Sequence, residues 1–167
     1  MNAVRGALMG SRSLLPALAA AVLVAPLASA ALHGGFELLS PQEYQSELTA
    51  RATPNATLVT TAADVDAPTI TVVHPDRGAP IKPPVDIDLR FKAAQGATVT
   101  VSSLRITYGF LRLDITKRIL GAPGVQVTSD GLKASGAQLP SGSHKLIIEI
   151  ADNIGRVGRQ PLDFIVQ

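Results

Sequence analysis

The stretch that decides the fold is Leu139-Pro-Ser-Gly-Ser-His-Lys-Leu-Ile-Ile-Glu-Ile-Ala-Asp-Asn-Ile-Gly-Arg156, followed by Leu162-Asp-Phe-Ile-Val-Gln167. Residues 144–151 and 162–166 are rich in strand-forming side chains, and the Asp-Asn-Ile-Gly turn between them predicts a hairpin. Pro161 has no N–H to give to a ladder, so it belongs at a sheet edge or a strand start. The chain therefore closes on two paired β-strands.

Short strands between Gly and Pro turns continue back to Asp66. Val85-Asp-Ile-Asp-Leu-Arg-Phe91 alternates without error, which predicts one buried and one charged face. The Asp130-Gly131 pair favours a tight hairpin turn. Seven to nine short strands without a long helix predict an all-β, antiparallel sandwich. The other strands are expected over 70–73, 98–101, 104–108, 110–115, 125–128 and 132–134, with a helical turn at 116–120.

The closing segment resembles that of bacterial immunoglobulin-like domains, which occur in exported and envelope proteins. The matching residues are Leu139, Pro140, Gly142, His144, Asp152, Gly155, Phe164 and Val166, and Asp66-Ala-Pro68 fits the opening of such a domain. The resemblance spans about residues 66–167, with a specific part of under thirty residues, and Tyr108–Thr116 has no counterpart in that pattern. It implies an immunoglobulin-like sandwich over residues 67–167. Such domains share no catalytic residues, so the resemblance assigns no site.

The first thirty residues predict a cleaved signal peptide. Arg5 and Arg12 precede an apolar run over 14–28, and Ala28-Ser29-Ala30 has the small side chains of a cleavage site. A mature chain that starts at residue 31 would be periplasmic or secreted, and it would meet the membrane only through the transient leader. Because the sequence has no Cys, a lipid cannot be attached to an N-terminal Cys.

Charge and composition narrow the function further. The chain has 15 Lys and Arg against 13 Asp and Glu, and removal of Arg5 and Arg12 leaves 13 against 13. A mature chain without net charge lacks the electrostatic footprint of a nucleic-acid binder. The absence of Cys excludes thiol catalysis and Cys-based zinc sites. The fold must therefore be held by its core alone.

Residues 31–66 predict a flexible N-terminal arm with one short helix. Ser40-Pro41-Gln42-Glu43 reads as a capping box with Pro at the first helical position, which would start a helix that ends near Arg51. A helix this short is marginal without a docking surface, so it packs on the sandwich, meets a partner or frays. Residues 52–66 have linker composition. On this view, deletion of residues 31–60 would leave the sandwich folded.

None of the three histidines, His33, His74 and His144, shares a metal-ligand spacing with another. We expect His144 to be a partly buried ring that bonds to nearby backbone. Ser141-Gly-Ser143-His144 lacks the elbow of a nucleophilic serine, and adjacent residues of a strand point to opposite faces. The sequence therefore assigns no catalytic residue, no cofactor-binding residue and no metal ligand.

Two charged clusters remain. Asp64 and Asp66, with Asp152 and Asn153, could gather at one end of the sandwich as calcium ligands, although solvated turn residues are the simpler interpretation. Asp86 and Asp88 fit a solvent face paired with Arg90 or Lys92. Arg105, Arg112, Lys117 and Arg118 could form a basic patch for an acidic partner, or a solvated face. Tyr108 should point inward, and the lack of Trp disfavours stacking on sugars.

These observations favour an exported, non-catalytic module that acts by protein–protein contact in a bacterial envelope, with an unknown envelope protein as partner. Edge strands and the helix near 41–51 are the expected contact surfaces, because an edge offers unpaired backbone groups. The alternative is a periplasmic module that binds a ligand or calcium. An enzyme is not expected, because no titratable residues converge in the sequence.

Overall fold

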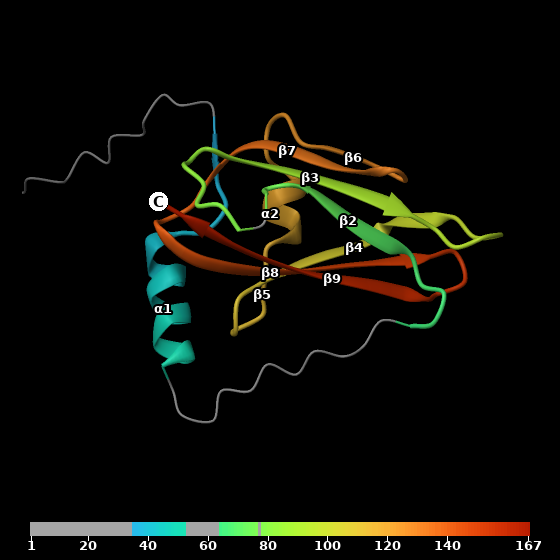
Figure 1. Cartoon of the computed structure of the whole chain (residues 1–167), viewed down its shortest axis with the longest axis horizontal. Helices are drawn as coiled ribbons and strands as arrows, with labels where there is room; N and C mark the ends of the chain where they lie inside the picture. Colours follow the sequence, from blue (N-terminus) through green and yellow to red (C-terminus); the bar gives the residue numbers. More distant parts are fainter. Residues whose placement is uncertain (1–34, 53–63, 77) are drawn as a thin grey trace, which may run out of the picture. The chain divides into compact units, whose positions relative to one another are not determined.

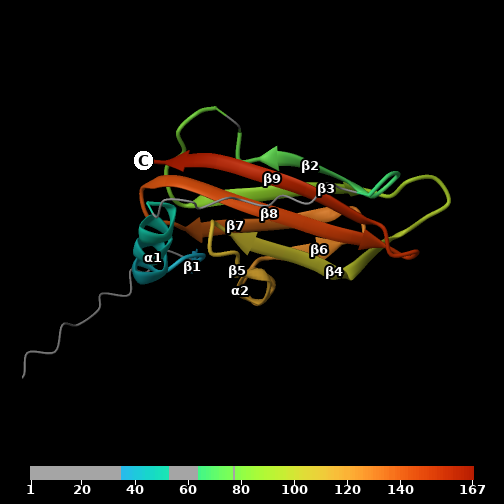
Figure 2. The same cartoon turned by 90° about the horizontal axis from the view of Figure 1, so that it is seen from below.

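Two β-sheets pack face to face in the computed structural model, which describes residues 35–52, 64–76 and 78–167 (Figures 1 and 2). The strands are β1 (Phe36–Glu37), β2 (Thr69–His74), β3 (Val85–Lys92), β4 (Val99–Tyr108), β5 (Leu113–Asp114), β6 (Gln126–Thr128), β7 (Gly131–Gln138), β8 (Gly142–Asp152) and β9 (Val157–Val166). The helices are α1 (Pro41–Arg51) and the short α2 (Thr116–Leu120). The prediction of an all-β sandwich of seven to nine strands is confirmed.

One sheet has the order β1-β7-β3-β2, with β6 also paired to β7, and the other has the order β5-β4-β8-β9. All pairs are antiparallel except β1 with β7. The longest ladder is the predicted closing hairpin, which runs from Gly142 opposite Val166 to Ala151 opposite Val157. The β6–β7 hairpin turns through Ser129 and Asp130, as the Asp-Gly pair predicts. The two sheets enclose a single apolar core.

Strand β3 shows why the alternating pattern was informative. Val85, Ile87, Leu89 and Phe91 are buried, while the residues between them are exposed or half-buried. The two strands expected over 98–101 and 104–108 are instead one strand, β4, with a register shift against β8. The shift allows this strand to continue through two Ser residues that the sequence pattern marked as a break.

The N-terminal segment is part of the sandwich rather than a separate arm over residues 36–52. Leu38 and Leu39 are buried in the core, and Leu38 N donates to Gln138 O at 3.0 Å beside the β1–β7 pair. Ser40 caps α1 in the predicted capping box with Glu43. These contacts place the segment in the same unit as the strands, so deletion of residues 31–60 would remove core side chains, contrary to the expectation above.

The outward edge of β9 is used by other segments at both of its ends. Near its end Ile81 N donates to Ile165 O at 2.8 Å, and near its start Val157 N donates to Asp64 Oδ2 at 2.8 Å. The backbone groups of residues 157 and 165 therefore point away from β8. Pro161 lies midway between them, so a backbone N–H at this position would also point away from β8, and its absence removes no hydrogen bond from the β8–β9 ladder. The edge position predicted for Pro161 is confirmed.

The opposite edge of the same sheet is irregular. Strand β5 pairs with β4 only at positions 107–108. Between Thr100 and Arg105 the β4–β8 register shifts, and the Ser103 hydroxyl enters the ladder: it accepts from Ala151 N at 2.7 Å and donates to Thr100 O at 2.6 Å. A bulge of this kind disfavours addition of a partner strand.

The signal peptide predicted over residues 1–30 lies outside the described residues, as does most of the linker composition noted over 52–66. Among the residues that are described, no helix is both long and apolar enough to cross a bilayer.

Candidate functional site

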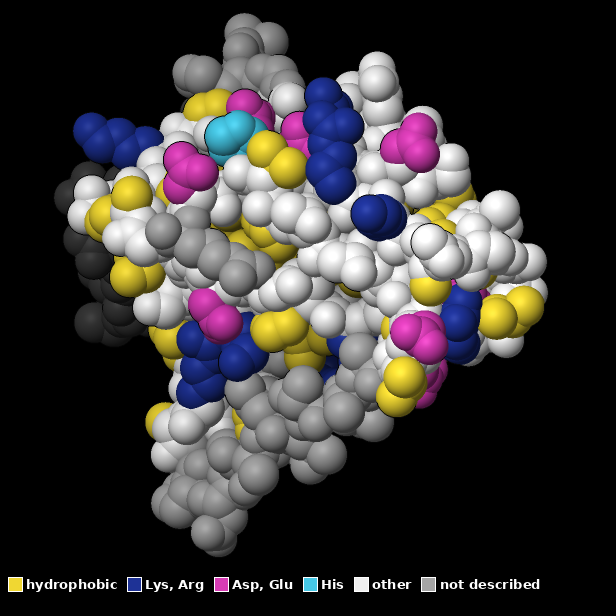
Figure 3. Space-filling model, turned by 45° about the vertical axis from the view of Figure 1, so that its right-hand side comes forward, with side chains coloured by type: hydrophobic (Ala, Val, Ile, Leu, Met, Phe, Trp, Pro, Cys, Tyr) yellow, Lys and Arg dark blue, Asp and Glu magenta, His cyan; other side chains and the backbone are white. Residues whose placement is uncertain are grey.

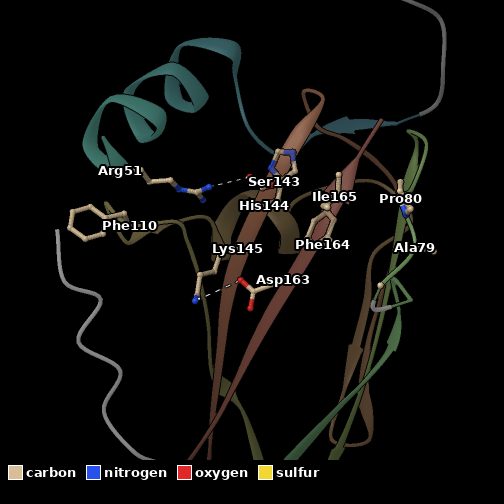
Figure 4. Close-up of a pocket in the computed structure, with 11 residues that line it drawn as sticks. Arg51, Ala79, Pro80, Phe110, Ser143, His144, Lys145, Asp163, Phe164 and Ile165 are labelled. Carbon is tan, nitrogen blue, oxygen red and sulfur yellow. Dashed lines mark hydrogen bonds and ion pairs between the residues drawn. The ribbon is translucent and has the colours of Figure 1, made fainter. Parts of the chain in front are cut away.

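A groove of about 640 Å³ lies over the outer face of the β8–β9 hairpin (Figure 4). Its floor is formed by residues 143–145 of β8 and 163–165 of β9. Arg51 of α1 and Phe110 of the β4–β5 turn stand on one side, and the loop at 78–80 stands on the other. The groove is therefore built by segments from both ends of the described chain.

His144 anchors this hairpin from the core side. Its ring is 2% exposed and lies between Tyr44 and Phe164, with ring centroids 5.3 Å and 5.4 Å away. Gly142 lets Tyr44 approach, since a Cβ at position 142 would clash with the Tyr44 hydroxyl. The floor of the groove is thus backed by a stack of three rings that includes a residue of α1.

The hydrogen bonds of His144 fix its tautomer. Nε2 lies 2.8 Å from the carbonyl oxygen of Pro140, which can only accept, so Nε2 carries the hydrogen. Nδ1 then accepts from the Tyr108 hydroxyl at 2.8 Å. Burial lowers the pKa of His144 below its usual range and raises the pKa of Tyr108. Both ring nitrogens of His144 are thus occupied, which confirms the buried, backbone-bonded ring.

Glu47 fixes the wall of the groove. This residue of α1 is 1% exposed, and its carboxylate accepts from the backbone N–H of Phe110 and, at 3.0 Å, from that of Leu111. Arg51, one helical turn later, donates to the same carboxylate at 2.8 Å. Gly109 has a φ of 67° and passes so close to the Glu47 carboxylate that a Cβ there would clash. The turn is therefore held in one conformation by the helix.

The tip of that turn is exposed and strained. Leu111 is 54% exposed, and Arg112 has a φ of 52°, a region that non-glycine residues rarely adopt. Strain of this kind persists only where surrounding contacts impose it, and it concentrates at functional sites. Glu47 holds the two residues that precede Arg112, so the helix contributes to the shape of one side of the groove.

Inside the groove, polar groups sit among apolar ones. Arg51 Nη1 donates to Ser143 O at 3.3 Å, and Lys145 Nζ lies 3.7 Å from Asp163 Oδ1 (Figure 4). Ile165, at 50% exposure, is the largest exposed apolar side chain of the floor. The arrangement can hold an apolar group and orient a polar one, which is the general composition of small-ligand sites.

Three of the four residues considered for calcium, Asp64, Asp152 and Asn153, are engaged in hydrogen bonds within the fold. Asp152 is buried, and it accepts from Ile154 N, from Arg156 N and, at 2.7 Å, from Arg156 Nε. Burial alone would raise the pKa of Asp152, but these hydrogen bonds outweigh it, so the pKa lies below its usual range. Asp64 holds the start of β9, as described above, and Asn153 Oδ1 accepts from Thr98 N at 2.9 Å. Among the described residues, no group of three or more His, Asp or Glu side chains could hold a metal ion.

Asp88 lies on the outer face of β3, as predicted. It pairs with Arg90 at 3.4 Å and, in place of Lys92, with Lys133 of β7 at 3.7 Å. Asp86 Oδ1 accepts from Gly136 N at 3.2 Å. These carboxylates join neighbouring strands of one sheet.

Two of the four basic residues considered as a patch, Arg105 and Arg118, are engaged in separate ion pairs. Arg105 pairs with Asp114 at 3.2 Å. Arg118 makes two bonds of 2.8 Å to Glu43 and one of 2.9 Å to Leu38 O, and so ties α2 to the N-terminal segment. On the face shown in Figure 3, acidic and basic side chains are interspersed rather than gathered by sign. This distribution gives no support to a binding site for an acidic partner.

The remaining sequence candidates lie apart. Ser143 is exposed while His144 is buried, so the two point to opposite faces, as expected. His74 is exposed at the end of β2, 4.0 Å from Asp76. His33 lies outside the described residues.

Sequence reasoning missed the groove and Glu47. Two signals were present: Glu47 and Arg51 have the i, i+4 spacing of a helical ion pair, and Tyr108–Thr116 fitted no part of the family pattern. The segment Tyr108–Thr116 contains Phe110, which forms part of the groove wall.

No known protein family matches the sequence, and no curated protein matches it. Among solved structures, the chain is similar to CopC from Methylosinus trichosporium OB3b, with 16% identity and a TM-score of 0.37. That likeness covers 59% of this chain and 94% of CopC. A TM-score this low supports no inference about ligand or function, and membership of the bacterial immunoglobulin-like family stays a prediction.

Proposed function

We propose that this protein is an exported, non-catalytic module that binds a small ligand in the β8–β9 groove. The observation that supports this function is the groove itself, whose volume of about 640 Å³ falls within the range of small-ligand sites. One of its walls is held by hydrogen bonds to the Glu47 carboxylate. Export and a periplasmic or secreted location rest on the leader-like residues 1–30.

Three observations favour a bound ligand over the other functions considered. Ile81 and Asp64 bond to both ends of the β9 edge and the Ser103 bulge distorts β4, which weakens the case for strand addition to the β5-β4-β8-β9 sheet. The helix α1 buries Tyr44 and Glu47, so this face of the helix is not available to a partner. Asp152 has its carboxylate bonded within its own turn, which weakens the calcium alternative. Contact with an envelope protein stays a prediction.

A non-catalytic role is supported by the groove residues. The His144 nitrogens are both bonded away from the groove, so the ring offers no free base to a substrate. Ser143 is the groove hydroxyl, and it has no hydrogen bond to a histidine or carboxylate among the described residues. Nucleophilic catalysis by serine needs such a base.

The test is native mass spectrometry of the tagged mature protein, purified gently from its own envelope. We expect a small-molecule adduct on the wild type that is lost in Ile165→Glu, which places a charge in the groove. Ile154→Glu is the matched control, because Ile154 is also exposed (65%) but lies in the β8–β9 turn, outside the groove. Absence of any adduct, or an adduct that survives Ile165→Glu, would overturn the proposed function.

A further inference from the structure

The apolar part of the groove defines one half of its ligand. Ile165, Pro80 and Phe110 line it from three separate segments. Ile165 is half exposed because it lies on the outer face of β9, where it faces the groove. Covering such surface contributes about 25 cal/mol per Å², so a ligand with an apolar body gains by lying here.

The cations of the groove define the other half. Lys145 Nζ carries three donors, and its carboxylate partner is Asp163, which is 3.7 Å away and whose side chain is 65% exposed. Arg51 uses Nε on Glu47 and Nη1 on Ser143 O, while its Nη2 has no acceptor among the described residues. Among the described residues, the groove lining therefore contains two cations, Arg51 and Lys145, and one carboxylate, Asp163, while the Glu47 carboxylate that pairs with Arg51 is buried.

The floor sets the size of the ligand. It spans three residues of each strand, a length of about 10 Å at 3.3 Å per residue. At this end of β9 the carbonyl oxygen of Ile165 already accepts from Ile81 N, which weakens the case for an extended chain adding to the sheet beside the groove. These limits favour a compact molecule over a polypeptide segment.

We infer that the groove takes a small monocarboxylate with an apolar body, whose carboxylate meets Lys145 and Arg51 and whose body covers Ile165 and Pro80. This inference rests on the proposed function and adds the chemical class of the ligand. Lys145 acts as the principal determinant of specificity, because its ammonium is held by one exposed carboxylate and is free to turn toward a ligand.

The test uses the full mature chain and three probes with the same alkyl chain: sodium octanoate, 1-octanol and octylamine, each below its micellar concentration. Titrations are followed in ¹H–¹⁵N spectra at the amides of Ser143, Lys145 and Ile165. We expect octanoate to bind at least about tenfold more tightly than octanol, the scale of one charge-assisted contact. Octylamine should bind most weakly.

Lys145→Glu should reverse the order of octanoate and octylamine. Lys133→Glu is the matched control, because Lys133 also lies on a strand 3.7 Å from a carboxylate, that of Asp88, but on the other sheet; it should leave the order unchanged. Equal binding of all three probes in the groove would overturn the inference while leaving the proposed function standing. Absence of groove shifts with every probe would also overturn the inference, and the adduct experiment above decides the proposed function separately.

Discussion

The Tyr108 hydroxyl donates to Nδ1 of His144 across a distance of 2.8 Å, and this bond joins β4 to β8 in the centre of the core. The other ring nitrogen donates to Pro140 O, and burial of the ring, which lowers its pKa, keeps the ring neutral. A neutral ring at this position gives the fold a dependence on pH that can be measured.

Acid should weaken the fold through His144. Burial lowers its pKa in the folded state, whereas in the unfolded state it stays near 6.5. Above pH 6.5 the ring is neutral in both states and has no effect; below it the unfolded chain binds the proton first, so stability falls as the pH falls. Urea unfolding at pH 7.5 and 5.5 should show this loss. The double variant Tyr108→Phe/His144→Phe, which removes both partners together, should lose most of the difference between the two pH values. An unchanged difference would assign it to other groups.

Glu47→Ala should destabilise the protein by about 3 kcal/mol, because it leaves the N–H groups of Phe110 and Leu111 and the guanidinium of Arg51 without their shared acceptor. Glu47→Gln keeps one acceptor and should cost less. Guanidinium unfolding measures both, with Gln45→Ala on the exposed side of α1 as the control. If Glu47→Ala cost no more than the control, the carboxylate would not be holding the turn.

Glu43 should make a contribution that disappears in acid. The hydrogen bond from Arg118 lowers the pKa of Glu43 to about 2. Its ionised form therefore stabilises the fold above the usual Glu pKa of about 4.3, and that stabilisation is lost as the pH falls toward 2. Because both side chains are partly exposed, Glu43→Gln should cost only about 1 kcal/mol at pH 7.

The unfolding midpoints of wild type and Glu43→Gln should therefore converge as the pH approaches 2. If the difference between the two midpoints stayed constant with pH, Glu43 would be stabilising the fold through neutral hydrogen bonds at the helix cap rather than through its charge.

Pro161→Thr should change stability by less than about 0.5 kcal/mol, since position 161 faces away from β8 and a new N–H there would meet solvent. The matched substitution Leu162→Thr, at a buried position of the same strand, should cost about 2 kcal/mol or more. Thermal unfolding of the two variants compares them directly. A large loss for Pro161→Thr would mean that the outward parity is wrong.

Much of the sandwich was predictable because alternation in strands such as β3 reports burial directly. The closing hairpin, the Asp-Gly turn and the inward Tyr108 follow from residues close together in sequence. The packing of the N-terminal segment could not be predicted from nearby residues, because α1 is held by polar contacts to distant parts of the chain. Glu47 bonds to the β4–β5 turn, and Glu43 bonds to Arg118, 75 residues away. A helix that docks through a buried carboxylate shows little apolar periodicity, and no local pattern identifies its distant partners.

The groove could not be predicted from the sequence either, because it also depends on contacts between distant segments. Phe110 belongs to a turn whose shape depends on Glu47, and Ile165 belongs to a strand whose outward face looked ordinary. Neither residue carries a recognisable binding motif. The site is a product of how three separate segments meet, and only the structure brings them together.

Because one wall of the groove contains Arg51 and the floor contains Ile165, the site requires both the first helix and the last strand. Synthesis proceeds from the N-terminus, so a growing chain has the wall long before it has the floor. The proposed binding therefore needs β9 as well as α1, and a nascent chain that has not yet reached β9 should not capture the ligand.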